Sequence, residues 1–240
     1  MTGTIVRPSG AGPDEVAARL ATARRRIAAA GGDPARVEVV AVTKGFGLPA
    51  VRAALACGLV RVGENYADEL VEKAAALAAE PGAGGDLVAA LQWHFLGPIQ
   101  RNKLPRLAPI VHCYEGVDRL AEGEAIATRS PGAAVLVEVR TVEDPGRPGV
   151  APAAVAPLVA ALRRLALDVR GLMTVAPAGG GEPARQAFAS VRRLADDLGL
   201  AVRSMGMTDD LELAVAEGAT CVRLGRALFG ARPGAVEVSQ

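Results

Sequence analysis

Lysine is scarce in this sequence. Only three of the 27 basic residues are lysines, at positions 44, 73 and 103, and the others are arginines. Both side chains supply a positive charge, but only lysine readily loses its proton when it is desolvated and then acts as an amine nucleophile. Lys44 follows the apolar stretch VEVVAV, residues 37–42. Its placement therefore raises the question of amine chemistry at this point of the chain.

Aromatic residues are also rare, at 3% of the chain, and the formal net charge is +1 with both signs interleaved. A nucleic-acid interface normally carries a basic stripe or aromatic side chains on which bases stack, so the sequence argues against that partner. No apolar run approaches the roughly 18 residues of a membrane-spanning helix, and no polybasic tract is present for a membrane surface. The N-terminal segment lacks the layout of a signal peptide, so we interpret residues 1–12 as a flexible lead-in.

Cysteine is the third scarce residue type. Cys57, Cys113 and Cys221 are far apart, odd in number and form no CxxC pair, so they indicate neither a zinc site nor a redox site. We expect them to be small buried residues in a protein of the reducing cytoplasm. His94 and His112 also lack a nearby carboxylate or cysteine pattern, so no metal site is predicted.

Apolar runs of strand length alternate with alanine-rich amphipathic segments along most of the chain. A first helix is predicted from about 14 to 30. Strands are predicted at 37–42, 59–62, 91–96, 110–113, 134–139, 169–175, 200–204 and 220–224. Helices are predicted near 48–57, 66–79, 99–107, 117–129, 151–166, 183–198 and 209–217, with boundaries good to ~2–4 residues.

This order of elements predicts an α/β protein, a single closed (β/α)8 barrel of the TIM type with an extra N-terminal helix. Repeated strand–helix units give parallel strands with right-handed crossovers, and eight units in about 200–250 residues match a closed barrel. The alternative, an open doubly wound sheet, usually carries a glycine-rich fingerprint after its first strand. Here that strand leads into TKGFG, which is neither GxGxxG nor a P-loop. The predicted barrel covers residues 13–233, and residues 234–240 form a tail.

In such a barrel the functional residues lie at the C-terminal ends of the strands. That rule places Lys44 at the barrel mouth, where burial lowers the pKa of a lysine. Gly206 and Gly225 follow the last two strands, and glycine lets backbone N–H groups approach an anion, as in the common phosphate site of barrels. The glycines would also suit tight turns, and Lys44 would also suit an ion pair. Together they indicate a phosphorylated aldehyde held as a Schiff base, with pyridoxal 5′-phosphate (PLP) as the candidate.

Arg223 lies two residues before Gly225 and is a candidate partner for the pyridine nitrogen of PLP. An arginine can only donate, so the nitrogen would stay unprotonated and the ring would be a weaker electron sink than with an acidic partner. The alternative is a salt bridge at the barrel end. A sugar-phosphate aldolase would use a similar lysine, but it would also need acid–base carboxylates, of which the predicted strand ends offer few.

Several long motifs follow one another along the chain. They are AVTKGF around Lys44, VGENYADEL (62–70), WHFLGPIQRNK (93–103), VDRL (117–120), RGLMTVAP (170–177) and SMGMTDDLELAVAEGATCVRLGRALFGAR (204–232). Through these motifs the sequence resembles the PLP homeostasis proteins, a family related to the barrel domain of alanine racemase. The resemblance extends from about residue 14 to residue 233.

The resemblance implies that Lys44 forms the Schiff base with PLP. It implies that Arg223 faces the pyridine nitrogen and that Asn65 lies near the cofactor. Around the phosphate it places Ser204, Gly206, Thr208, Gly225 and Arg226, several of them through backbone N–H groups. Members of the family are usually monomeric and bind and supply PLP without a secure catalytic activity. The expected partners are therefore PLP and, as candidate recipients, PLP-dependent apo-enzymes.

Two regions depart from the family pattern. After the fifth strand the family often shows an asparagine-containing strand and a Lys-Ser-Gly loop, whereas this chain has Glu138 and Arg147-Pro148-Gly149. The role of the 140–149 loop is therefore open. Thr208 stands where serine is frequent, and the change keeps the hydroxyl.

The alternative function is a PLP-dependent amino-acid racemase. Racemisation needs a base on each face of the bound substrate. In alanine racemases the second base is a tyrosine from the partner subunit of a dimer with an extra β-domain. This chain ends soon after its last predicted strand, and its only tyrosines are Tyr66 and Tyr114. A wet, uncovered cofactor suits transfer better than controlled carbanion chemistry, so we expect PLP binding without robust turnover.

Overall fold

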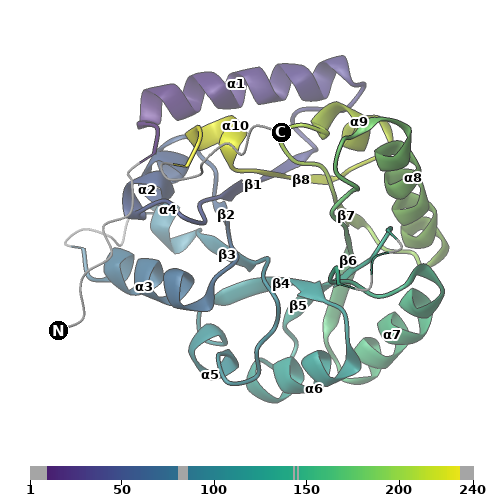
Figure 1. The fold of residues 1–240 in the computed structure, drawn as a ribbon. Helices are drawn as coiled ribbons and strands as arrows, with labels where there is room; N and C mark the ends of the chain where they lie inside the picture. Colours follow the sequence, from purple (N-terminus) through teal and green to yellow (C-terminus); the bar gives the residue numbers. More distant parts are fainter. Residues whose placement is uncertain (1–9, 81–85, 143, 145, 233–240) are drawn as a thin grey trace.

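The computed structural model describes residues 10–80, 86–142, 144 and 146–232. Within them eight strands close into a barrel in the order β1 to β8, and each strand runs parallel to its two neighbours (Figure 1). The strands are β1 (Glu38–Val42), β2 (Arg61–Glu64), β3 (Gln92–Phe95), β4 (Val111–Val117), β5 (Ala134–Glu138), β6 (Asp168–Met173), β7 (Val202–Ser204) and β8 (Cys221–Leu224). The predicted (β/α)8 barrel is confirmed. Most of the predicted lead-in and the whole predicted tail lie outside the described residues.

The helices surround this ring of strands. They are α1 (Pro13–Ala29), α2 (Leu48–Ala56), α3 (Ala67–Ala78), α4 (Asp86–Ala89), α5 (Leu104–Leu107), α6 (Leu120–Arg129), α7 (Pro152–Arg164), α8 (Gly181–Asp197), α9 (Leu211–Ala216) and α10 (Arg226–Phe229). The extra helix α1 lies outside the β1–β8 side of the barrel, where it contacts α2, α9 and α10 (Figure 1). None of the helices in the described part of the chain is long and apolar enough to cross a membrane.

Among the differences between predicted and observed boundaries, that of the second strand matters most for the site. We predicted it at 59–62, but β2 begins at Arg61 and runs to Glu64. Leu59 still belongs to the turn that ends α2, because its N–H donates to the carbonyl oxygen of Ala54. The later start carries Gly63 and Glu64 into the sheet, where they pair with β3.

Two helix starts also differ from the prediction. The helix expected over 99–107 is reduced to the single turn of α5, which has a proline in its first turn. The sequence of Asp209 and Glu212 also matches the pattern of a capping box, but the structure does not form one. Asp210 precedes α9 without a side-chain cap bond, and Glu212 instead forms a bidentate pair with Arg26 of α1.

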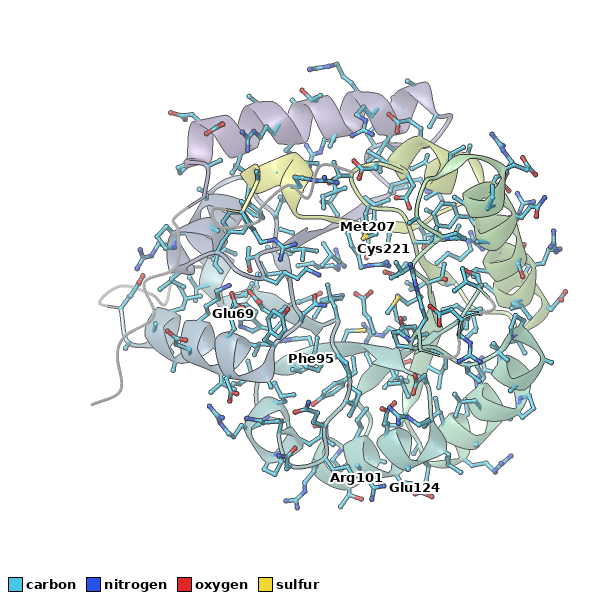
Figure 2. All side chains as sticks on the ribbon, viewed as in Figure 1. Glu69, Phe95, Arg101, Glu124, Met207 and Cys221 are labelled. Carbon is cyan, nitrogen blue, oxygen red and sulfur yellow. The ribbon has the colours of Figure 1, made fainter. Side chains whose placement is uncertain are left out.

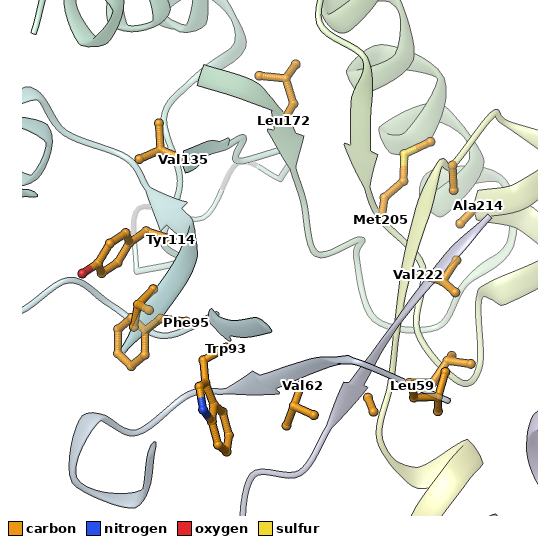
Figure 3. Packing of buried hydrophobic residues seen from close by; sticks show 14 of the residues in the cluster. Leu59, Val62, Trp93, Phe95, Tyr114, Val135, Leu172, Met205, Ala214 and Val222 are labelled. Carbon is orange, nitrogen blue, oxygen red and sulfur yellow. The ribbon is translucent and has the colours of Figure 1, made fainter. Parts of the chain in front are cut away.

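The apolar core lies between the strands and the helices. Successive residues of a strand point to opposite faces of the sheet. Trp93 and Tyr114 accordingly point outward into this layer, together with Val135 and Leu172 (Figure 3). The helices cover these side chains, and their burial stabilises each strand at about 25 cal/mol per Å² of apolar surface.

The barrel interior is lined partly by polar side chains. Apolar residues and two cysteines fill part of it, including Val40, Cys113, Leu136 and Cys221. The later residues of several strands are buried in this interior and polar or charged, and they are His94, Glu115, Glu138, Ser204 and Arg223. Buried polar groups are costly unless they are paired. Their concentration near the C-terminal ends of the strands therefore marks that end as the functional one.

Candidate cofactor site at the barrel mouth

Lys44 lies two residues beyond the end of β1 and is partly buried. Burial lowers the pKa of its amine, and the positive charges of Arg232 and Arg223 lower it further, whereas the carboxylate of Glu64 acts in the opposite direction. In the described part of the chain no hydrogen bond or ion pair holds this amine. A larger fraction of Lys44 is therefore neutral near neutral pH than for an ordinary surface lysine.

Two loops meet beside the end of β1, one after β7 and one after β8. In the first loop, the Thr208 hydroxyl accepts a hydrogen bond of 3.1 Å from the N–H of Ala227, in the first turn of α10. Arg226 of α10 forms a salt bridge with Asp209 of the first loop. The structure thus brings the loop of Thr208 and the start of α10, where Arg226 lies, into contact.

Glycine stands at the start of each of these loops, where the backbone leaves little room for a side chain. Gly206 has a φ of +92°, which other residues rarely adopt, and a Cβ built there would lie 2.5 Å from the Cβ of Ala214. A Cβ built at Gly225 would lie 3.2 Å from the carbonyl oxygen of Val42, the last residue of β1. The backbone of both loops is therefore close-packed and uncovered by side chains of its own, which suits approach of an anion.

Arg223 is held inside the barrel by β6 and β7. Its Nη1 donates to the carbonyl oxygen of Ser204 at 2.6 Å and to the Ser204 hydroxyl at 2.9 Å. Its Nη2 donates to the carbonyl oxygen of Thr174 at 2.8 Å. The guanidinium is thus fixed by three hydrogen bonds and makes none of them to a carboxylate. The salt bridge considered as an alternative is absent among the described residues.

The Ser204 side chain connects Arg223 to a buried acid. Its hydroxyl donates to Glu115 Oε2 at 2.6 Å, and Glu115 Oε1 lies 2.5 Å from His94 Nδ1. Burial would raise the pKa of Glu115, but the hydrogen bonds and charges around it, from His94 first, hold it below its ordinary value. His94 is therefore a hydrogen-bonded structural histidine. The hydroxyl of Ser204 accepts from Arg223 and donates its single hydrogen to Glu115, so that hydrogen is not available to a further acceptor.

Glu138 occupies the end of β5, where the family often has a different residue. Burial raises its pKa to about 7, although the charge of Arg223 acts against that shift. The loop after Glu138 folds back on the strand, because Val150 N–H donates to the Glu138 carbonyl oxygen and Arg140 N–H donates to Val150. Arg140 and Val150, at the two ends of this loop, therefore lie beside the end of β5.

Asn65 follows β2 directly and is partly buried. Its carbonyl oxygen would lie 2.0 Å from a Cβ built at Gly97, so this position, two residues after β3, can only be glycine. Asn65 is thereby fixed at the mouth through its backbone. Figure 2, in the same view, shows how side chains from all sides of the ring converge on the interior, with Cys221 of β8 among them.

Comparison with known proteins places this geometry in a family. The family model for the alanine racemase N-terminal domain matches residues 13–233. A pyridoxal phosphate homeostasis protein of Pseudomonas aeruginosa is 42% identical over 227 residues, covering 91% of this chain and 93% of the relative. One of Deinococcus radiodurans is 41% identical, covering 89% and 99%.

The chain belongs to the pyridoxal phosphate homeostasis protein family. PipY of Synechococcus elongatus, whose structure has been solved with PLP bound, superimposes with a TM-score of 0.76 at 32% identity, covering 90% of this chain and all of PipY. The resemblance found in the sequence motifs is therefore confirmed. For a homeostasis protein, the residues at this mouth are the place to look for cofactor contacts.

Some buried charged residues of the mouth were missed by the sequence reasoning. Lys73 and Glu69 lie on α3 and Glu115 lies in β4, and all three are buried. On α3 the spacing of Glu69 and Lys73 is that of an ordinary solvent-exposed helical ion pair. Glu115 could have been found from the sequence, because an acidic residue beside the apolar run of a barrel strand is unusual.

Proposed function

We propose that this protein binds PLP at the barrel mouth and holds it covalently through Lys44, as a carrier in PLP homeostasis without robust catalysis. One observation carries the proposal. Lys44, with a lowered pKa and an amine that has no hydrogen-bond partner in the described part of the chain, stands beside the two close-packed glycine loops. Arg223 is fixed on the same side of the barrel, since β8 pairs with β1.

The residues present fit this cofactor. PLP carries an aldehyde that a neutral lysine amine captures with loss of one water, and a phosphate that backbone N–H groups and arginine hold. Lys44 supplies the amine. Gly206, Thr208, Gly225 and Arg226 form the phosphate-binding loops, with Ser204 in support of Arg223.

Arg223 would set the electronic character of the bound ring. Its three hydrogen bonds to β6 and β7 leave Nε and one hydrogen of Nη2 for a further acceptor. A permanently protonated guanidinium donates to a pyridine nitrogen and does not protonate it. The ring then withdraws electrons weakly, which suits storage of the aldehyde. Asn65 borders the same space.

The racemase alternative would need a second base. Tyr114 points into the layer between strands and helices and is fully buried there (Figure 3). Tyr66, two residues after β2 and directly before α3, is 61% exposed. Neither tyrosine is placed in the barrel interior. We further expect the protein to act as a monomer in the cytoplasm, with PLP-dependent apo-enzymes as recipients.

Two assays separate the carrier from the enzyme. The purified protein is titrated with PLP, free PLP is removed by gel filtration, and the retained cofactor is measured by absorbance. Stoichiometric retention that is lost in Lys44→Arg supports the proposal, whereas equal retention by both proteins refutes anchoring at Lys44. The loaded protein is then incubated with L-alanine and other L-amino acids. Rapid, Lys44-dependent formation of the D-enantiomer would replace the carrier function with a racemase function.

A further inference from the structure

A buried charged cluster lies behind Lys44, between the ends of β1 and β2 and helix α3. It comprises Thr43, Glu64, Glu69 and Lys73, whose exposed fractions are 0%, 0%, 4% and 2%. Lysine and glutamate are almost never this buried unless they are paired. The cluster is thus a specific arrangement and differs from the solvated helix face that the sequence of α3 suggested.

Lys73 uses all three of its ammonium hydrogens inside this cluster. Its Nζ lies 2.5 Å from Glu64 Oε1, 2.8 Å from Glu69 Oε1 and 2.8 Å from the carbonyl oxygen of Thr43. The first two contacts are ion pairs, and the third is to the main chain. Lys73 therefore ties α3 to the backbone of the segment that leaves β1.

The backbone contacts of the cluster lie on both sides of Lys44. The Thr43 carbonyl, which accepts from Lys73, belongs to the peptide group that precedes Lys44. The N–H of Gly45, which donates to Glu69 Oε1 at 2.7 Å, belongs to the peptide group that follows Lys44. Figure 2 shows Glu69 pointing from α3 toward this side of the barrel. The buried ion pair of Lys73 and Glu69 therefore forms hydrogen bonds with the peptide groups on both sides of Lys44.

Glu64 completes the arrangement. Its Oε1 accepts from the Thr43 hydroxyl at 2.5 Å as well as from Lys73, and its Oε2 is buried without a hydrogen-bond partner in the described part of the chain. The groups that act on the charge of Lys44 are Glu64, Arg223 and Arg232. Lys73 thus holds in place one of the three charges that tune the Lys44 amine.

We propose that Lys73 is a positioning residue for Lys44: together with Glu69 it fixes the two peptide groups of Lys44 and so directs the amine into the barrel mouth. The inference rests on the proposed function only in taking Lys44 as the anchor. The alternative is that the cluster contributes to stability alone. A loosened segment would let Lys44 turn toward solvent, and its amine would then behave more like an ordinary lysine.

The test uses the double variant Lys73→Met/Glu69→Met, with Lys103→Met as the matched control. Removing both charges avoids leaving one of them buried and uncompensated, and the remaining Glu64 can be neutral. Lys103 forms an exposed ion pair with Asp68 and takes no part in the buried cluster. Without cofactor, each protein is pulse-acetylated over a range of pH, and the modification of Lys44 is quantified by peptide mass spectrometry.

The expected result is a shift of the Lys44 acetylation profile toward higher pH in the folded double variant, with a wild-type profile in Lys103→Met. Capture of PLP should also become roughly 10- to 100-fold slower, the usual cost of a misplaced reacting group. The single variant Glu69→Gln keeps an oxygen acceptor for the N–H of Gly45. Its Lys44 acetylation profile should therefore equal that of the wild type. A folded double variant with an unchanged Lys44 profile would overturn the inference.

Two further outcomes are decisive. If the double variant does not fold, Glu69→Met keeps the Lys73–Glu64 pair and removes the acceptor for Gly45, and an unchanged Lys44 profile in that variant refutes the inference. If PLP proves to be attached elsewhere, the proposed function fails. The acetylation profile, measured without cofactor, still decides whether Lys73 positions Lys44.

Discussion

Arg223 contacts Ser204 twice, with its Nη1 at 2.6 Å from the carbonyl oxygen and 2.9 Å from the hydroxyl oxygen of that residue. Ser204, at the end of β7, therefore accepts two of the three hydrogen bonds that orient the guanidinium of Arg223. The same hydroxyl donates to the buried carboxylate of Glu115. Ser204 thus links the charge that would face the cofactor ring to the interior of the barrel.

This relationship predicts the effect of Ser204→Ala. The change leaves Glu115 Oε2 and one Arg223 hydrogen without their partner in a buried site, which costs about 1–3 kcal/mol of unfolding free energy. Urea denaturation followed by circular dichroism measures the loss. Thr128→Ala, which removes an exposed hydroxyl of α6, should change stability by less than about 0.5 kcal/mol. Equal losses in the two variants would contradict the proposed role of the Ser204 hydroxyl.

The raised pKa of Glu138 leads us to expect that the stability of the protein depends on pH. That pKa is about 7 in the folded protein, above the ordinary 4.5. The folded state therefore binds the proton more tightly than the unfolded state, so stability is greatest below about 4.5 and declines as the pH rises toward 7.

The variant Glu138→Gln mimics the neutral acid and should make this decline shallower, as measured by thermal unfolding at a series of pH values. Part of the decline should remain, because burial also raises the pKa of Glu64 to about 7. A variant whose stability falls with pH as steeply as that of the wild type would show that Glu138 titrates normally.

The close packing around Gly206 predicts that a side chain at this position destabilises the proposed phosphate-binding loop. Gly206 and Gly179 share a φ of +92°, but a Cβ at Gly206 would lie 2.5 Å from Ala214 whereas one at Gly179 would meet nothing within 4 Å. Gly179→Ala should cost only the backbone strain, about 1 kcal/mol. Gly206→Ala should cost more and should weaken PLP retention. Calorimetric unfolding and equilibrium dialysis with PLP measure the two effects, and equal behaviour of both variants would argue against close packing at Gly206.

The barrel was predictable from sequence because short apolar runs alternate regularly with longer amphipathic segments along the chain. Lys44, Gly206 and Arg223 were found because barrel topology gives the ends of strands a special position. Physical reasons also explain the failures. The start of β2 was misplaced because the apolar Leu59 resembles a strand residue, although its N–H closes the turn after α2.

The cluster behind Lys44 was not predictable in the same way. Glu69 and Lys73 are spaced as a surface ion pair of α3, and only the tertiary structure shows that this face of the helix is turned toward β1 and β2. The commitment of the Ser204 hydroxyl to Arg223 was equally hidden, because it joins residues far apart in the sequence. Contacts of this kind depend on the closed barrel and leave no local pattern.

Attachment of PLP to Lys44 is the central claim, and borohydride trapping tests it most directly. The chain has three lysines; Lys73 is buried with its three hydrogens bonded, and Lys103 forms an exposed ion pair with Asp68. The PLP-loaded protein is reduced with borohydride, digested and mapped by mass spectrometry, with Lys44→Arg as the control. The account predicts a stoichiometric phosphopyridoxyl group on the Lys44 peptide and none in the control. An unmodified Lys44 in the reduced, loaded protein would contradict it.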